Sequence, residues 1–388
     1  MTTATLFKTR WGRLGLTVGG LTVLALVFVW AAPDLSGVGD VFAAVVWKWV
    51  AASLLANVAS TWLRALSWQV TLEQALPAPP PSHRNVVSAF SVGLLGNAVL
   101  PGRVGEFTRV AVISRRLPHG STTWPSVAGS IFAHRVLDVI PIAGLAIFIL
   151  AAARLPSFAV PGLGLVLGIG GVFLITAVLL ARRGSHGVAA DQASRVRKLI
   201  AMVRRGLGVF RAPAPAALAS FLQVGAWALQ LLAVWLALLA FGINEPIAAA
   251  ALVLLVVNVT LAFPLWPGAV GLYQAGVALA LLPYGISYEH GFAAGIGIQA
   301  IEACVGIGLG LLFLAREGVS FAMLKQMPRV TNEQFVNTIT QEQRRPPPRY
   351  RRRVLVRTAA FRRAVSKVRG KPARTPERRG RPLETPRV

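Results

Sequence analysis

Charged side chains are scarce in this sequence of 388 residues, where Asp, Glu, Lys and Arg together make up only 14%. An average soluble domain is about 25% charged. Hydrophobic residues reach 55%, and the mean hydropathy is +0.61. This composition excludes a water-soluble globule and predicts an integral membrane protein.

Cysteine and the common catalytic motifs are missing as well. The single cysteine, Cys304, lies in an apolar run, which excludes an intramolecular disulfide and a Cys-based zinc site. There is no Walker P-loop, no HExxH motif, no nucleophile elbow and no cluster of His or Cys ligands. We therefore expect no cofactor, no metal and no enzymatic activity.

Acidic residues number only 14 against 40 Lys and Arg, which gives a formal charge of +26. Residues 316–388 hold 20 of these basic residues and 5 of the acids. We expect 319–388 to be a basic, largely disordered cytoplasmic tail, in which 350–369 forms an amphipathic helix on the anionic leaflet. A plain solvated tail is the alternative, and nucleic acid is not an expected partner.

Long apolar runs, in contrast, are abundant. A helix needs about 20 mostly apolar residues to cross the hydrocarbon core of a bilayer. About six segments meet this requirement, and they cover residues 14–32, 41–70, 127–153, 160–181, 215–241 and 291–315. The expected fold class is all-α, a polytopic helical membrane protein.

Two further apolar regions, 86–117 and 248–283, are interrupted near their middles by proline and glycine. The interrupting residues are Pro101, Gly102 and Gly105 in the first region and Pro264, Pro267, Gly268 and Gly271 in the second. Proline lacks a backbone donor and disfavours helix in the residue before it. Each region is therefore predicted to be a broken helix or a re-entrant hairpin, shielded by protein or by a wet cavity.

The distribution of Lys and Arg predicts the topology, because these residues accumulate at the cytoplasmic ends of spans. Segment 1–13, the loop 182–213 and the tail are all basic. They lie together in the cytoplasm if 86–117 enters and leaves the membrane from that side. Region 248–283 then begins and ends outside, either as a re-entrant hairpin or as two short crossings. We expect a cell-membrane protein with both termini in the cytoplasm.

Ionisable residues at bilayer depth cost about 2.5–3.5 kcal/mol each, so each one is a candidate functional residue. Arg103, Glu106 and Arg109 follow the first break at i, i+3 and i+6, which places them along one face of a helix. Together with Asn97 they form a candidate headgroup site, since arginine and a helix N-terminus both bind phosphate. The alternative is an ion pair that only locks the hairpin.

Two other groups contain further candidate headgroup ligands. Arg135 and Asp138 stand at i, i+3 near the start of a predicted span, where a salt bridge at the membrane boundary is the alternative. Gln274 and Glu302 are candidates in the second half of the chain, and an interhelical hydrogen bond is the alternative for them. Lys48 and Arg64 are expected to snorkel toward the membrane surface, and an interfacial anchor is the alternative for Arg64.

The order of these motifs resembles the lysylphosphatidylglycerol synthase transmembrane domain family, which is also described as flippase-like. The matching segments are 100–109 (LPGRVGEFTR), 135–138 (RVLD) and 267–271 (PGAVG). The resemblance implies a flippase-like transmembrane domain over 14–318 that handles a lipid made by a separate enzyme. The family commonly has Glu where this sequence has His134 and Gln274, which favours an anionic phospholipid or a polyprenyl-phosphate-linked cargo over a cationic headgroup.

The sequence therefore predicts a protein that binds an anionic lipid headgroup and moves it between the leaflets of the membrane. A second hypothesis is a scaffold that recruits a partner enzyme through its basic tail. A third is a membrane-embedded lipid transferase with Glu106 or Asp138 as its base, which the scarcity of acid–base residues disfavours.

Overall fold

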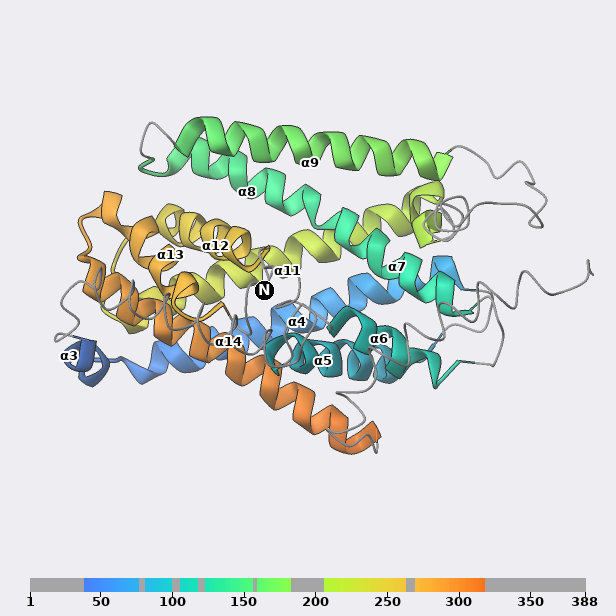
Figure 1. Ribbon diagram of the computed structural model, residues 1–388, viewed down its shortest axis with the longest axis horizontal. Coiled ribbons are helices and arrows are strands. Elements are labelled where there is room, and N and C mark those ends of the chain that lie inside the picture. Colours follow the sequence, from blue (N-terminus) through green and yellow to red (C-terminus); the bar gives the residue numbers. More distant parts are fainter. Residues whose placement is uncertain are drawn as a thin grey trace, which may run out of the picture. The chain divides into compact units, whose positions relative to one another are not determined.

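The computed structural model describes residues 38–76, 81–99, 105–117, 123–155, 159–182, 206–262 and 269–317. All of them belong to the first of two units into which the chain divides, Met1–Ile339. These ranges contain helices and their connections and no strand. The predicted all-α class is therefore confirmed for the described part of the chain (Figure 1).

Four of the predicted spans are confirmed as helices long and apolar enough to cross a membrane. They are Ser126–Ala152, formed by α7 (Thr123–Leu137) and α8 (Val139–Ala152); Val160–Ala181, within α9 (Ala159–Arg182); α11 (Pro213–Ala240); and Tyr288–Arg316, within α14 (Tyr288–Glu317). The predicted span 14–32, the tail 319–388 and most of the loop 182–213 lie outside the described residues.

The predicted span 41–70 is divided differently from the expectation. A short helix α3 (Val38–Ala43) precedes α4 (Trp47–Ala75), which has 29 residues but is not one of the four strongly apolar helices. Serines on α4 recur every seven residues and donate to carbonyls of α11: Ser53 to Ala233, Ser60 to Ala226 and Ser67 to Ala219, at 2.7, 2.7 and 2.9 Å. Helix α4 can be polar because α11 satisfies its hydroxyl groups.

The first interrupted region forms two helices, α5 (His83–Val99) and α6 (Gly105–Ser114), which pack against each other as an antiparallel hairpin. Gly105 makes the close approach possible, because a Cβ there would overlap the carbonyl oxygen of Gly93 and the side chain of Asn97. Asn97 Oδ1 also accepts a hydrogen bond from the Gly105 N–H at 2.8 Å. Asn97 and Gly105 therefore hold the hairpin together.

The second interrupted region gives a similar pair, α12 (Ile247–Ala262) and α13 (Leu272–Leu281), followed by the short helix η4 (Leu282–Tyr284). Gly271 precedes α13 with φ 87°, a left-handed conformation that glycine adopts without strain. Of the predicted breaking residues, Pro101, Gly102, Pro264, Pro267 and Gly268 lie outside the described residues. The return of each hairpin within the bilayer stays a prediction.

The two hairpins open toward opposite ends of the helix bundle (Figure 1). Helix α5 begins beside the end of α4, where His83 Nδ1 lies 2.7 Å from Gln69 Oε1. Helix α12 follows the far end of α11, where the Ala240 carbonyl accepts from the Val46 N–H at 2.9 Å, just before α4 begins. Helices α5 and α12 therefore both run from an end of the bundle toward its middle.

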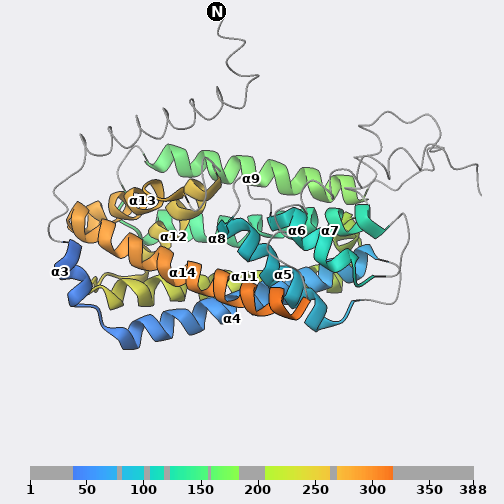
Figure 2. The same cartoon turned by 60° about the horizontal axis from the view of Figure 1, so that its bottom comes forward.

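Helix α14 passes both hairpins and connects them (Figures 1 and 2). Its first half packs on α13, where Gly295 lies against Gln274. Its second half packs on α5, where Gly310 lies against Leu95. A change in the position of either hairpin must therefore be accommodated at the same helix.

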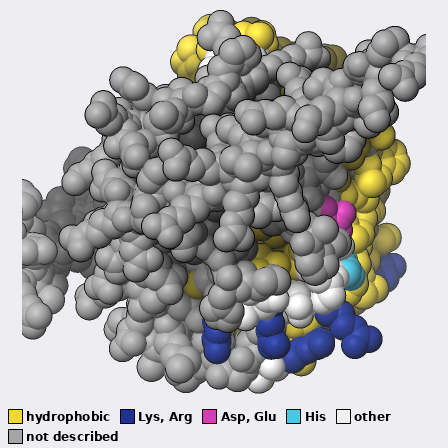
Figure 3. Space-filling view, turned by 90° about the vertical axis from the view of Figure 1, so that its right-hand side faces the viewer, with side chains coloured by type: hydrophobic (Ala, Val, Ile, Leu, Met, Phe, Trp, Pro, Cys, Tyr) yellow, Lys and Arg dark blue, Asp and Glu magenta, His cyan; other side chains and the backbone are white. Residues whose placement is uncertain are grey.

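Basic residues gather at the end of the bundle where α5 begins. Those at helix ends there are Arg84, Arg115, Arg116, Arg211 and Arg316. Figure 3 faces this end and shows a band of Lys and Arg side chains across it. The opposite end carries the acids Asp40, Glu245 and Glu289 beside Lys48 and Arg154. Basic residues thus predominate at one end of the bundle, which is the end that the predicted topology places in the cytoplasm.

The contact at Gly105 is a test of the hairpin. We expect Gly105→Ala to lower the free energy of unfolding by about 1–3 kcal/mol, because the added methyl overfills the contact between α5 and α6. Gly144→Ala in α8 is the matched control, since a Cβ at Gly144 has nothing within 4 Å. Thermal unfolding of the purified variants in detergent measures the difference. Equal melting temperatures for both variants would show that the hairpin is not packed in this way.

Candidate functional site

Three of the four spans carry a polar residue at their midpoint. Asp138 is the thirteenth of the 27 residues of Ser126–Ala152. Glu302 is the fifteenth of the 29 residues of Tyr288–Arg316, and Trp227 has a similar position in α11. Asp138 is therefore deeper than the boundary position expected from the sequence. A charge at this depth needs partners within the protein.

Asp138 lies at a break between α7 and α8. Pro141 explains the break, because its ring provides no donor for the Leu137 carbonyl and clashes with it. The Asp138 side chain is buried and accepts hydrogen bonds from three donors: Trp227 Nε1 at 2.9 Å, Arg135 Nη1 at 3.2 Å and Gln223 Nε2. Two of these donors come from α11, so the carboxylate ties the broken span to its neighbour.

Arg135 joins this network to the first hairpin. Its Nη1 donates to Asp138 and its Nη2 donates to Glu106 Oε1 on α6. The Arg135 side chain is nevertheless 44% exposed, although it lies one helical turn from the midpoint of a span. The charged network therefore reaches the surface of the protein at the guanidinium of Arg135.

Arg109 is more deeply buried than Asp138, with only 2% of its surface exposed. Its guanidinium lies over the rings of Phe90 at 3.8 Å and Trp68 at 5.8 Å, and its Nη1 is 3.4 Å from Glu106 Oε2. Gly93 leaves room for it, because a Cβ there would overlap the Arg109 side chain. Nε and Nη1 have no hydrogen-bond partner among the described residues. A buried guanidinium with unused donors is ready to bind an anion.

Arg64 belongs to the same charged centre. Its place there was not predicted from the sequence. Its guanidinium lies 5.2 Å from the ring centre of Trp227, in the middle of α11. It interacts electrostatically with Asp138 and with Glu302. The expected snorkelling of Arg64 is therefore wrong, because aromatic and acidic partners within the bundle stabilise its charge.

Gln274 and Glu302 form a separate polar cluster at the second hairpin. Glu302 accepts from Gln230 Nε2 and from the Tyr273 hydroxyl, both at 3.0 Å. Gln274 donates to Gln299 Oε1 at 2.5 Å and accepts from the Gly271 N–H at 2.6 Å. The bond to Gln299 agrees with the alternative, an interhelical hydrogen bond, and the bond from Gly271 caps α13 in addition.

The structure thus sorts the candidate residues into three groups. Glu106, Arg109, Arg135 and Asp138 come together in one centre at mid-span. Asn97 and Gly105 shape the hairpin beside it, while Gln274, Glu302 and Gly271 lie in the second cluster. Arg103 lies outside the described residues. The described residues include no group of three or more His, Cys, Asp or Glu that could hold a metal ion.

Sequence reasoning also missed the contribution of α11. Gln223, Trp227 and Gln230 recur at i, i+4 and i+7, so they share one face of a long apolar helix. This face donates to Asp138 at one end and to Glu302 at the other. The spacing of polar residues within an apolar span is the signal that would have found them.

The fold and its charged centre define an integral membrane protein with a polytopic helical domain. The chain belongs to the family described as the lysylphosphatidylglycerol synthase TM region, whose model matches residues 14–340. The family resemblance inferred from the motifs is therefore confirmed. No curated protein and no solved structure matches the chain.

The central role of Asp138 predicts a large effect on stability. We expect Asp138→Ala to lower the free energy of unfolding by about 3–5 kcal/mol, because Arg135 loses a partner and two buried donors on α11 are left unsatisfied. Glu73→Ala is the control, since Glu73 accepts a single neutral hydrogen bond from Gln69 near the basic end. Chemical unfolding in mixed micelles gives both values. If the two variants were equally stable, Asp138 would not hold the spans together.

Proposed function

We propose that the charged centre binds the phosphate of an anionic lipid headgroup and that the protein moves this lipid between the two leaflets. The observation that carries the proposal is Arg109, whose buried guanidinium keeps two nitrogens without a hydrogen-bond partner among the described residues. Arginine binds phosphate oxygens through a planar, bidentate arrangement of donors. A phosphate would bring acceptor oxygens to this guanidinium.

Glu106 supports the proposal because it already acts as an internal anion. Its carboxylate lies between Arg109 and Arg135 and makes an ion pair with each. A phosphate carries more acceptor oxygens than a carboxylate and can bridge the same two cations. In the proposed cycle, the headgroup phosphate displaces Glu106 on arrival, and Glu106 returns to the two arginines when the lipid leaves.

The route of the lipid follows from the exposure of the two arginines. Arg135 is 44% exposed and Arg109 is 2% exposed, so an anion arriving from the surface meets Arg135 first. The acyl chains stay in the surrounding bilayer while the headgroup moves along the charged residues. Helices α5 and α12 both run from an end of the bundle toward its middle, which supports a binding site near the midplane, as in many transporters.

The membership of the family supports a lipid as the cargo. An anionic phospholipid or a polyprenyl-phosphate-linked headgroup fits a centre that contains Arg64, Arg109 and Arg135. At the position where relatives commonly have a Glu, this chain has His134, which is buried against the ring of Phe90. We propose transport without catalysis, and a separate enzyme as the source of the lipid.

The proposed orientation places the basic end of the bundle in the cytoplasm of the cell. Arg84, Arg115, Arg116, Arg211 and Arg316 then lie on the inner face, in agreement with the positive-inside rule. In this orientation the hairpin of α5 and α6 enters from the cytoplasm, and the hairpin of α12 and α13 enters from outside.

The proposal predicts that Arg109→Gln slows translocation of fluorescent phosphatidylglycerol about 10- to 100-fold in vesicles that contain the purified protein. This range corresponds to the loss of one charged hydrogen-bonding partner, about 1.5–3 kcal/mol. Quenching of the fluorophore from outside the vesicles measures the rate.

Arg154→Gln is the matched control for this experiment. Like Arg109, Arg154 has its guanidinium near an aromatic ring, 5.6 Å from the ring centre of Tyr284. Unlike Arg109, it is exposed, and it lies at the acidic end of the bundle. This variant should move the lipid at the wild-type rate. Wild-type translocation in Arg109→Gln, with both variants folded, would contradict the proposed function.

A further inference from the structure

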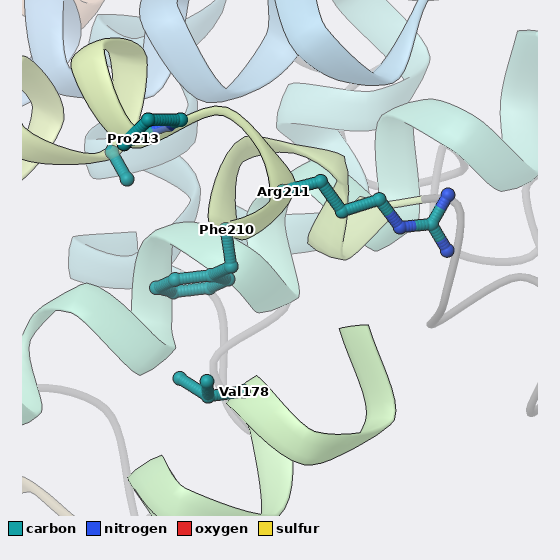
Figure 4. Close-up of a pocket in the computed structure, with 5 residues that line it drawn as sticks. Val178, Phe210, Arg211 and Pro213 are labelled. Atoms are coloured by element: carbon teal, nitrogen blue, oxygen red, sulfur yellow. The ribbon is translucent and has the colours of Figure 1, made fainter. Parts of the chain in front are cut away.

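A pocket lies at the basic end of the bundle, away from the charged centre (Figure 4). It is formed where α9 meets the short helix η2 (Leu207–Arg211) and the start of α11. Its lining residues are Val178, Phe210, Arg211, Pro213 and Ala216, and its volume is about 550 Å³. This volume lies in the range of about 300–1,000 Å³ that is typical of ligand pockets.

The pocket is amphipathic, and its polar part is a single arginine. Figure 4 shows the ring of Phe210 facing Val178, while the guanidinium of Arg211 extends away from both. Arg211 Nε donates to the Ala181 carbonyl at 2.8 Å, which fixes the side chain at the end of α9. Its two terminal nitrogens have no hydrogen-bond partner in the described part of the chain.

The pocket lies at the ends of the apolar spans, which is the level of the lipid headgroups in a membrane. Ala181 is the last residue of one span, and Pro213 is the first residue of another. Arg211 is therefore at the boundary of the apolar segments, whereas Phe210 and Val178 face each other on the apolar side of it. Beyond Val178, the apolar residues Ile175 and Val172 of α9 are also exposed.

We propose that this pocket is a second lipid site, which holds one anionic phospholipid with its phosphate on Arg211 and an acyl chain between Phe210 and Val178. Charge complementarity favours this occupant, because basic pockets between membrane helices at one surface bind anionic headgroups. A free phosphate ion would meet only one cation and would leave the apolar part of the pocket unused. The site does not depend on the charged centre, so the two proposals can fail separately.

The test counts lipids on the purified full-length protein by native mass spectrometry. The protein is first stripped of lipid and then titrated with phosphatidylglycerol or with phosphatidylcholine. Arg109→Gln is the background, because it removes the anion site proposed above. In this background one phosphatidylglycerol should bind, and Arg211→Gln should weaken it about fivefold, which is the ~1 kcal/mol that one interfacial arginine contributes.

Val178→Phe fills the apolar part of the pocket and leaves Arg211 in place. It should weaken phosphatidylglycerol binding as well, while Arg154→Gln should leave it unchanged. Phosphatidylcholine should bind more weakly than phosphatidylglycerol to the background protein, and inorganic phosphate should not compete at equal concentration. Unchanged binding in either Arg211→Gln or Val178→Phe would overturn the proposal, because the site needs both its charge and its pocket.

Discussion

The ion pairs that Arg135 makes with Glu106 and Asp138 connect the first hairpin to the break between α7 and α8. Moving a charge from water into a medium of low dielectric constant is costly, and removal of one partner of a buried pair leaves the other uncompensated. The ion pair between Glu106 and Arg135 therefore fixes the position of the first hairpin. The hydrogen bond from Trp227 on α11 to Asp138 fixes the position of the broken span.

The same constraint accounts for the position of the candidate site. A charged network at mid-span is stable only if each charge finds a partner, and the bundle supplies these partners from helices far apart in the chain. Arg109 has aromatic neighbours and an ion pair with Glu106, and its Nε and Nη1 make no hydrogen bond among the described residues. A buried guanidinium with such donors is suited to an anionic ligand.

Much of the fold could be predicted from composition and spacing. Long apolar runs identified four spans, and proline with glycine identified both helical hairpins, because each of these signals is local. The pairing of Glu106 with Arg135 could not be predicted in this way, since 29 residues separate them and no pattern indicates which helices meet. The polar face of α4 also misled the expectation for Arg64, because hydropathy does not tell whether a polar side chain is satisfied by a neighbouring helix.

The two proposed lipid sites differ in depth and in chemistry. Arg211 lies at the end of the spans beside an apolar pocket, where a lipid can rest in its ordinary orientation. Arg109 is buried in the charged centre beside Glu106, where a headgroup is present only if the protein takes it there. The depth at which a lipid phosphate contacts the protein therefore separates binding at the surface from movement through the membrane.

The proposed transport requires that a lipid phosphate reaches Arg109, and solid-state NMR can measure this contact in bilayers. Dipolar dephasing between lipid phosphorus and the labelled guanidinium nitrogens of arginine reports their proximity. We expect a dephased signal from a buried arginine that disappears in Arg109→Gln and persists in Arg211→Gln. Dephasing that is the same in wild type and Arg109→Gln would show that the phosphate does not reach Arg109.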